Sequence, residues 1–178
     1  DQFSKPGVAK LAMNMLDEGT ANRNALEIND ELIMLGAELG AGSNLDTSYV
    51  SLSSLTTTVE DSLEIFADVV LNPDFPEEEL ERLRKQQLTS IRQEQSTPNS
   101  MALRVLPELI YGSDHAYSNP LTGSGTIESV QSIGLDELKK FHQTWFKPDN
   151  ATMIVVGDTS MEQVRDMLEE KFAGWEPG

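Results

Sequence analysis

The residues best placed for chemistry lie on one predicted helix near the start of the chain. The segment KPGVAKLAMNMLDEGT, residues 5–20, has apolar residues at the three-and-four spacing of an α-helix. Lys10, Met13, Asn14 and Asp17 share a neighbouring stripe, because their spacing follows the turns of that helix. Side chains one turn apart can offer two ligands to one metal ion, but lysine and methionine do not hold zinc. On residue types alone, the stripe is a solvated or partner-facing surface.

The composition favours one globular domain that spans residues 1–178. Hydrophobic residues make up 38% of the chain, which is enough for a real core. No run approaches the ~18 apolar residues of a membrane span, so membrane insertion is not expected. The 30 acidic and 13 basic residues give a net charge of -17, which repels phosphate backbones. Nucleic acid is therefore not an expected partner.

The chain contains no cysteine, which removes disulfides, thiolate nucleophiles and sulfur-bound metals together. Because this fits reducing and oxidising compartments alike, localisation stays open, with the bacterial periplasm preferred to the cytoplasm. The chain begins at Asp1 with neither an initiator methionine nor a signal-like segment. We expect it to be a piece of a longer protein.

Periodicity and turn signals predict many helices and few strands. After the first helix, the predicted helices span 24–36, 58–72, 76–98, 101–111 and 135–146, with a last one after Ser160, and the predicted strands span 38–44, 47–55 and 151–158. Asn24 with Glu27, and Thr58 with Asp61, are typical capping pairs. The Gly- and Pro-rich stretch 112–125 predicts a loop.

This order of elements predicts an α+β fold in two layers. Helices are expected to pack on one face of a small antiparallel or mixed sheet. That sheet should contain residues 38–44, 47–55 and 151–158. Three strands are few for so many helices, so further strands are expected before Asp1.

The remaining motifs in the sequence do not predict a functional site. GSGT, residues 123–126, follows no predicted strand and lacks the lysine of a phosphate loop, so nucleotide binding is rejected. His115 and His142 are the only histidines, and neither has a second histidine within a turn, which favours structural or exposed roles. The charged run that opens at Glu77 favours a solvated helix face over a partner-binding surface.

Five stretches, taken in their order along the chain, carry a resemblance to a known family. They are KPGVAKLAMNMLDEGT, LIMLGAELGAGSNLDTSYVSLSSL, LNPDFPEEELERLRKQ, YGSDHAYSNPLTGSGTIESVQSI and FHQTWFKPDNATMIVVGD. With these stretches the chain resembles a domain of the pitrilysin/insulinase family of zinc metallopeptidases, which includes the mitochondrial processing peptidase. The resemblance implies the metallohydrolase fold of that family.

The resemblance also implies a lost zinc site. In active members the first helix carries H-x-x-E-H, with the glutamate as general base, and a third ligand, a glutamate, follows ~76 residues beyond the second histidine. Laid on that motif, the histidines fall on Lys10 and Asn14, the base on Met13 and the third ligand on Ser90. These side chains cannot replace the imidazoles and carboxylates that bind zinc. The resemblance therefore implies no catalytic residue, no metal and no other cofactor in this domain.

Family members pair a zinc-bearing half with a zinc-less half, and the two enclose a chamber for unstructured peptides. This chain is similar to part of the inactive half. Its expected function is that of a non-catalytic domain of a zinc-dependent peptidase, whose catalytic partner half holds the zinc. Lys10, Met13, Asn14 and Asp17 are then candidate chamber-facing residues, because the equivalent stripe faces the chamber in active relatives.

Two alternatives stay open. In the first alternative, the chain is a structural or assembly subunit without a role in proteolysis, as the family's core proteins of the respiratory chain are. In the second, it is an unrelated acidic binding module. An H-x-x-E-H helix elsewhere in the same polypeptide favours the peptidase. The family's substrate-contacting arginine and tyrosine lie in the following domain, so no residue here inherits those roles.

Overall fold

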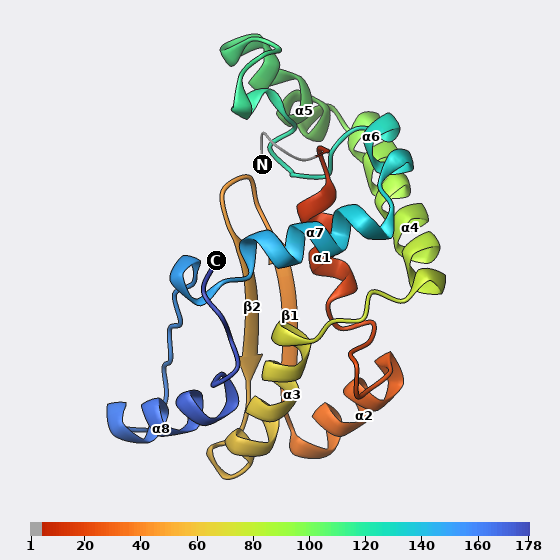
Figure 1. Cartoon of the computed structure of the whole chain (residues 1–178). Helices are drawn as coiled ribbons and strands as arrows, with labels where there is room; N and C mark the ends of the chain where they lie inside the picture. The colour runs from red at the N-terminus through yellow and green to blue at the C-terminus, as the bar shows by residue number, and fades with distance from the viewer. Residues whose placement is uncertain (1–4) are drawn as a thin grey trace.

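The structure, a computed structural model, describes residues 5–178 and consists of helices arranged around a β-hairpin (Figure 1). The helices are α1 (Val8–Met15), α2 (Ala25–Leu35), α3 (Val59–Leu71), α4 (Glu77–Ser96), α5 (Pro98–Tyr111), α6 (Ile127–Ser132), α7 (Leu135–Trp145) and α8 (Met161–Lys171). Short 3-10 turns are η1 (Thr56–Thr58), η2 (Ala116–Ser118) and η3 (Pro148–Asn150). The strands are β1 (Glu38–Ser43) and β2 (Ser48–Ser53).

The hairpin has one face on the helical core. β1 and β2 pair antiparallel, with Leu39 opposite Leu52 and Ala41 opposite Val50. These four side chains pack against the core, whereas Tyr49, which points the other way, is 58% exposed. Helices α1, α2 and α3 contact the hairpin. The predicted α+β architecture, with helices on one face of a small antiparallel sheet, is confirmed.

Local capping signals fix the start of α2 but not that of α3. The Asn24 side chain accepts from the Glu27 N–H at 3.0 Å, and the Glu27 carboxylate accepts from the Asn24 N–H at 2.8 Å, which is the predicted capping box. The predicted cap of Thr58 with Asp61 is wrong. The Thr58 hydroxyl donates instead to the carbonyl of Leu35 at 2.8 Å, so it joins the end of α2 to the start of α3.

Helix α1 lies at the centre of the core. It contacts β1, α4 and α7, and α7 crosses it in Figure 1. Leu11, Met13 and Met15 are 0% exposed. Because a helix with neighbours on several sides must be apolar on several sides, α1 carries a wider apolar surface than a helix at the edge of a domain.

Residues 151–158 do not form the predicted strand. They make an extended connection between η3 and α8 (Figure 1), and among the described residues β1 pairs only with β2. Ile154 and Val156 are 82% and 93% exposed. The apolar run gives this segment a preference for β-structure, but a strand forms only through hydrogen bonds to a neighbouring strand, which it lacks within residues 5–178.

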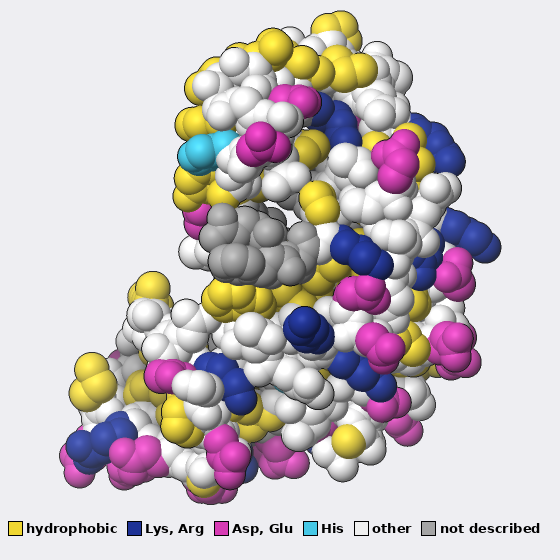
Figure 2. Space-filling view, turned by 45° about the horizontal axis from the view of Figure 1, so that its top comes forward, with side chains coloured by type: hydrophobic (Ala, Val, Ile, Leu, Met, Phe, Trp, Pro, Cys, Tyr) yellow, Lys and Arg dark blue, Asp and Glu magenta, His cyan; other side chains and the backbone are white. Residues whose placement is uncertain are grey.

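Helix α5 projects from the rest of the molecule. It contacts α4 and η2, and Pro107 is its only buried residue. Leu109 and Ile110 are 77% and 61% exposed, and hydrophobic side chains gather over this end of the molecule in Figure 2. Within residues 5–178, no helix combines the length and the apolar character that a membrane span needs.

A buried carboxylate joins the loop after α1 to α3. Asp68 is 6% exposed and accepts hydrogen bonds from Thr20 Oγ1 at 2.7 Å, Asn22 Nδ2 at 2.8 Å, Asn72 Nδ2 at 3.1 Å and Arg23 Nη1 at 2.8 Å. Burial raises the pKa of this carboxyl, but the four hydrogen bonds outweigh burial and hold the pKa below its usual value. The fold therefore stabilises the ionised form of Asp68.

Replacing Asp68 with alanine should lower the free energy of unfolding by about 3 kcal/mol, because four donors lose their shared acceptor. Urea denaturation followed by circular dichroism measures the change. The matched control is Asp30→Ala on α2, an exposed carboxylate without an ion pair among the described residues, which should cost less than about 0.5 kcal/mol. Equal losses in the two variants would contradict this role for Asp68.

The stability difference between the wild type and Asp68→Ala should shrink as the pH falls. The folded-state pKa of Asp68 lies below the unfolded value of ~3.9, so its contribution is present above that value and is lost as the pH falls through the folded pKa. Urea midpoints at about pH 7, 5 and 3 test this dependence. A difference that stays constant would assign the effect to packing rather than to the ionised carboxylate.

Candidate functional site

The four residues of the α1 stripe differ in exposure. Lys10 and Asn14 on α1, and Asp17 in the turn after it, are half-buried. Met13 is completely buried and belongs to the core cluster, so it fills core volume and offers nothing to a ligand. The candidate chamber-facing surface is thereby reduced to Lys10, Asn14 and Asp17, and for these three it stays a prediction.

Ser90, which the resemblance predicts to take the position of the third zinc ligand, lies on α4. This helix packs against α1 and contributes Leu83, Leu88 and Ile91 to the same core. Ser90 is half-buried, and its hydroxyl donates to the carbonyl of Gln86 in its own helix at 3.1 Å. The structure therefore brings together the two helices that carry the motif positions.

The side chains at these positions do not fit a zinc ion. Protein ligands of zinc are imidazole nitrogens, thiolates and carboxylates. Lys10 supplies an ammonium, Asn14 a carboxamide, Met13 a buried thioether and Ser90 a hydroxyl that is bonded to the backbone. Over residues 5–178, no three His, Asp or Glu side chains are grouped to hold a metal. The donor set itself therefore provides no means of activating a water molecule on zinc.

The two histidines contact backbone and aromatic groups rather than the motif positions on α1 and α4. His142 Nε2 lies 2.8 Å from the carbonyl oxygen of Val70, and its ring lies 4.6 Å from that of Phe146. Burial lowers the pKa of His142 below its ordinary value, so its neutral form is favoured. His115 is exposed and stacks on Tyr111 with ring centroids 5.0 Å apart. Neither histidine joins the motif positions.

The Gly- and Ser-rich loop between η2 and α6 supports the start of α1. Arg104 of α5 donates to Glu94 at 2.6 Å and to the carbonyl of Gly125 at 2.7 Å. Ser129 donates to the carbonyl of Pro6 at 2.7 Å. A Cβ on Gly125, which has φ 78°, would lie 2.3 Å from that same carbonyl oxygen, so only glycine fits there. The sequence predicts neither these contacts nor α6.

A hollow of about 340 Å³ opens between the end of α1, helix α2 and the start of β1. Ile28, Leu32 and Ala37 are among its lining residues, but they are only 2%, 8% and 7% exposed. Asp17 and Glu38 also line the hollow. The sequence does not predict this hollow, because only the tertiary fold brings Glu38 and α2 beside Asp17.

The cleft carboxylates lack a cationic partner. Neither Asp17 nor Glu38 forms an ion pair among residues 5–178, and Arg82, the one cation that acts on Asp17, binds Glu18 and Glu79. Burial raises the pKa of Asp17, its own backbone hydrogen bond lowers it, and the charge of Glu18 adds to the rise. The net result is a raised pKa, so the fold disfavours the ionised form of Asp17.

Comparison with family models covers most of the chain. Residues 1–124 match the model of insulinase, peptidase family M16, and residues 132–178 match that of the peptidase M16 inactive domain. The chain belongs to the insulinase family of peptidases. The resemblance noted in the sequence is confirmed, and the second match places the end of the chain with the family's inactive domain.

Individual relatives agree with this assignment. An uncharacterised zinc protease of Bacillus subtilis, YmxG, is 23% identical over 96% of this chain and 41% of its own length. A non-peptidase homologue of Helicobacter pylori is 24% identical over 91% of this chain and 37% of its own length. The solved structure of a peptidase M16 inactive domain from Pseudomonas fluorescens is 30% identical, with a TM-score of 0.89 over 100% of this chain and 43% of that one. This chain thus spans about two fifths of the relatives it matches.

The purified insulinase-family chain should retain far less than one zinc ion per molecule after dialysis, because its motif positions lack zinc-binding donors. Elemental analysis measures the metal, and a fluorogenic peptide measures hydrolysis with and without a chelator. The matched control, Lys10→His with Asn14→His and Ser90→Glu, restores the three ligand types and should take up more zinc. Stoichiometric zinc in the wild type, or cleavage that a chelator abolishes, would overturn this assignment.

Proposed function

We propose that this chain is a non-catalytic domain of a zinc-dependent peptidase. The observation that carries the proposal is the α1–α4 helix pair, which is packed as one unit although its motif positions hold Lys10, Met13, Asn14 and Ser90. The burial of Met13 supports it further, because the position of the general base is filled by core packing. Proteolysis then belongs to a separate half that holds the zinc.

The chain contributes binding surface and assembly contacts in this proposal. A half without zinc forms one wall of the chamber, and Lys10, Asn14 and Asp17 lie on that wall. Enclosing surfaces position an unstructured peptide and exclude water while the partner half cleaves it. Supporting observations are the inactive-domain match, the zinc-protease and non-peptidase relatives, and the two fifths of their length that the chain spans.

Reconstitution tests the proposal. Co-expression of this chain, within its full polypeptide, with a zinc-bearing half should support cleavage of unstructured peptides, whereas the chain alone should not cleave them.

In the assembled enzyme, the double variant Lys10→Glu with Asn14→Glu tests whether the α1 stripe faces the chamber. It should raise the preference for cationic over anionic peptides by about five-fold, which corresponds to about 1 kcal/mol. The ratio of kcat/KM values for two peptides of opposite charge measures the preference.

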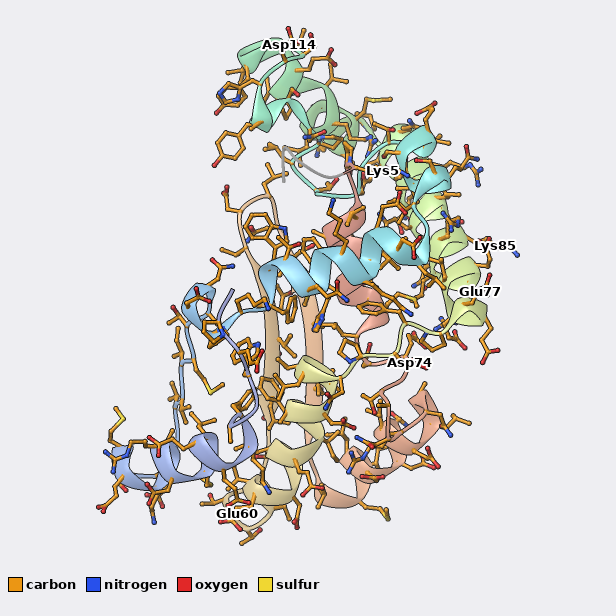
Figure 3. The ribbon with its side chains drawn as sticks, viewed as in Figure 1. Lys5, Glu60, Asp74, Glu77, Lys85 and Asp114 are labelled. Atoms are coloured by element: carbon orange, nitrogen blue, oxygen red, sulfur yellow. The ribbon has the colours of Figure 1, made fainter. Side chains whose placement is uncertain are left out.

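The matched control is Lys85→Glu with Gln86→Glu, which makes the same change of charge elsewhere. Both residues are exposed on α4, and Figure 3 shows Lys85 and Glu77 pointing away from the body of the molecule. This control should leave peptide preference unchanged. If the α1 double variant behaves like the control, the stripe is not part of a chamber. If cleavage by the zinc-bearing half needs no contribution from this chain, an assembly subunit is the better description.

A further inference from the structure

Residues 151–158 form an exposed, extended connection between η3 and α8, which runs along the outside of the molecule in Figure 1. Met153 and Val155 are 44% and 50% exposed, whereas Ile154 and Val156 are 82% and 93% exposed. This alternation is that of a β-strand, because successive side chains of a strand point to opposite faces. The segment therefore has the pattern of a strand but no strand partner within the part of the chain that the structure describes.

The backbone of this segment carries open hydrogen-bonding groups. The N–H and C=O groups of residues 152–156 form no hydrogen bond with any described residue. Such a backbone presents a row of donors and acceptors to a second strand. The residues themselves favour pairing, because Met-Ile-Val-Val is rich in β-branched side chains and no charge occurs before Asp158.

Both ends of the segment are fixed to the folded body. Before it, Asn150 Nδ2 donates to the carbonyl of Trp145 at 3.0 Å. After it, α8 contacts α3, and the ring of Phe172 lies 6.3 Å from that of Phe66. An extended segment that is held at both ends is preorganised for pairing, because it has less conformational freedom to lose when a strand binds.

We propose that residues 151–158 accept a β-strand from the polypeptide outside residues 1–178, and that the segment becomes a strand when it does so. The added strand is extended and apolar, because strand pairing satisfies the open backbone groups and cross-strand contacts cover Ile154 and Val156. The Pseudomonas fluorescens relative has the length to supply such a strand, since this chain matches only 43% of it. The inference goes beyond the proposed function, because completing a sheet requires neither zinc nor a bound peptide.

Other occupants match the segment less well. A helix bonds its own backbone groups to one another, so it would leave those of residues 152–156 unpaired. A lipid surface provides no partners for an open backbone. A second copy of the chain brings a further net charge of -17, and the two copies repel one another. A strand of the same polypeptide avoids each of these costs.

Amide hydrogen exchange tests the proposal. Exchange at residues 152–156 is measured by mass spectrometry in this chain and in the full polypeptide that contains it. In this chain the amides should exchange within about ten-fold of the unstructured rate. In the full polypeptide at least every second amide should exchange about a hundred-fold more slowly, because a strand on one edge pairs with alternate residues. Equally fast exchange in the two would overturn the proposal.

Two proline variants of the full polypeptide locate the pairing. Neighbouring residues of a strand direct their N–H groups to opposite edges, so either Ile154→Pro or Val155→Pro removes a paired donor. At least one of the two should speed exchange of the remaining protected amides by about ten-fold or more. The matched controls Ile154→Val and Val155→Thr keep the N–H group and the β-branched shape, and should exchange like the wild type. Wild-type protection in both proline variants contradicts strand pairing.

The same measurement separates the strand from other partners. Protection that appears in the isolated chain and grows with its concentration would overturn the proposal in favour of a second copy. Protection of the full polypeptide that appears only with an added unstructured peptide would overturn it in favour of peptide binding. Protection together with failed reconstitution of cleavage would support the strand and count against the proposed function alone.

Discussion

The buried carboxylate of Asp68 determines how the first helices meet. Its four donors come from the loop after α1 and from the end of α3, so one side chain holds segments that lie nearly fifty residues apart in sequence. Arg23 extends the network, because it also binds Glu31 on α2 at 2.9 Å. Since α1, α2 and α3 all meet the hairpin, this network sets the geometry of the α1–α2 corner, where the cleft opens.

Local signals in the sequence predict elements well where the chain satisfies its own backbone groups. The reciprocal bonds of Asn24 and Glu27, and the equivalent pair Ser160 and Gln163 at the start of α8, need only residues three positions apart. The antiparallel hairpin is predicted for the same reason, because its turn and its alternation are local. Residues 151–158 are mispredicted because strand formation depends on a neighbour, and periodicity says nothing about which neighbour is present.

The motif positions on α1 and α4 also combine features that the sequence predicts with features that depend on tertiary packing. Their residue types alone predict that the zinc site is missing, because no packing could give Lys10 or Asn14 the donor chemistry of histidine. Their burial was not predictable. Met13 shares a stripe with Lys10 and Asn14 by spacing, yet α1 is enclosed by β1, α4 and α7, so the stripe is divided between the core and a half-exposed edge. A buried carboxylate at Met13 would need a compensating partner, and methionine removes that need.

The hollow at the end of α1 is lined by Asp17, a carboxylate that the fold leaves without an ion pair among the described residues. Burial disfavours the charged form of Asp17, and no cation of this chain pairs with it among the described residues, so the folded chain alone gains little stability from this carboxylate. Asp68 on α3 is more deeply buried than Asp17, but its carboxylate accepts four hydrogen bonds. The two carboxylates therefore differ in their electrostatics: hydrogen bonds from four donors stabilise the ionised form of Asp68, whereas burial disfavours the ionised form of Asp17 and raises its pKa.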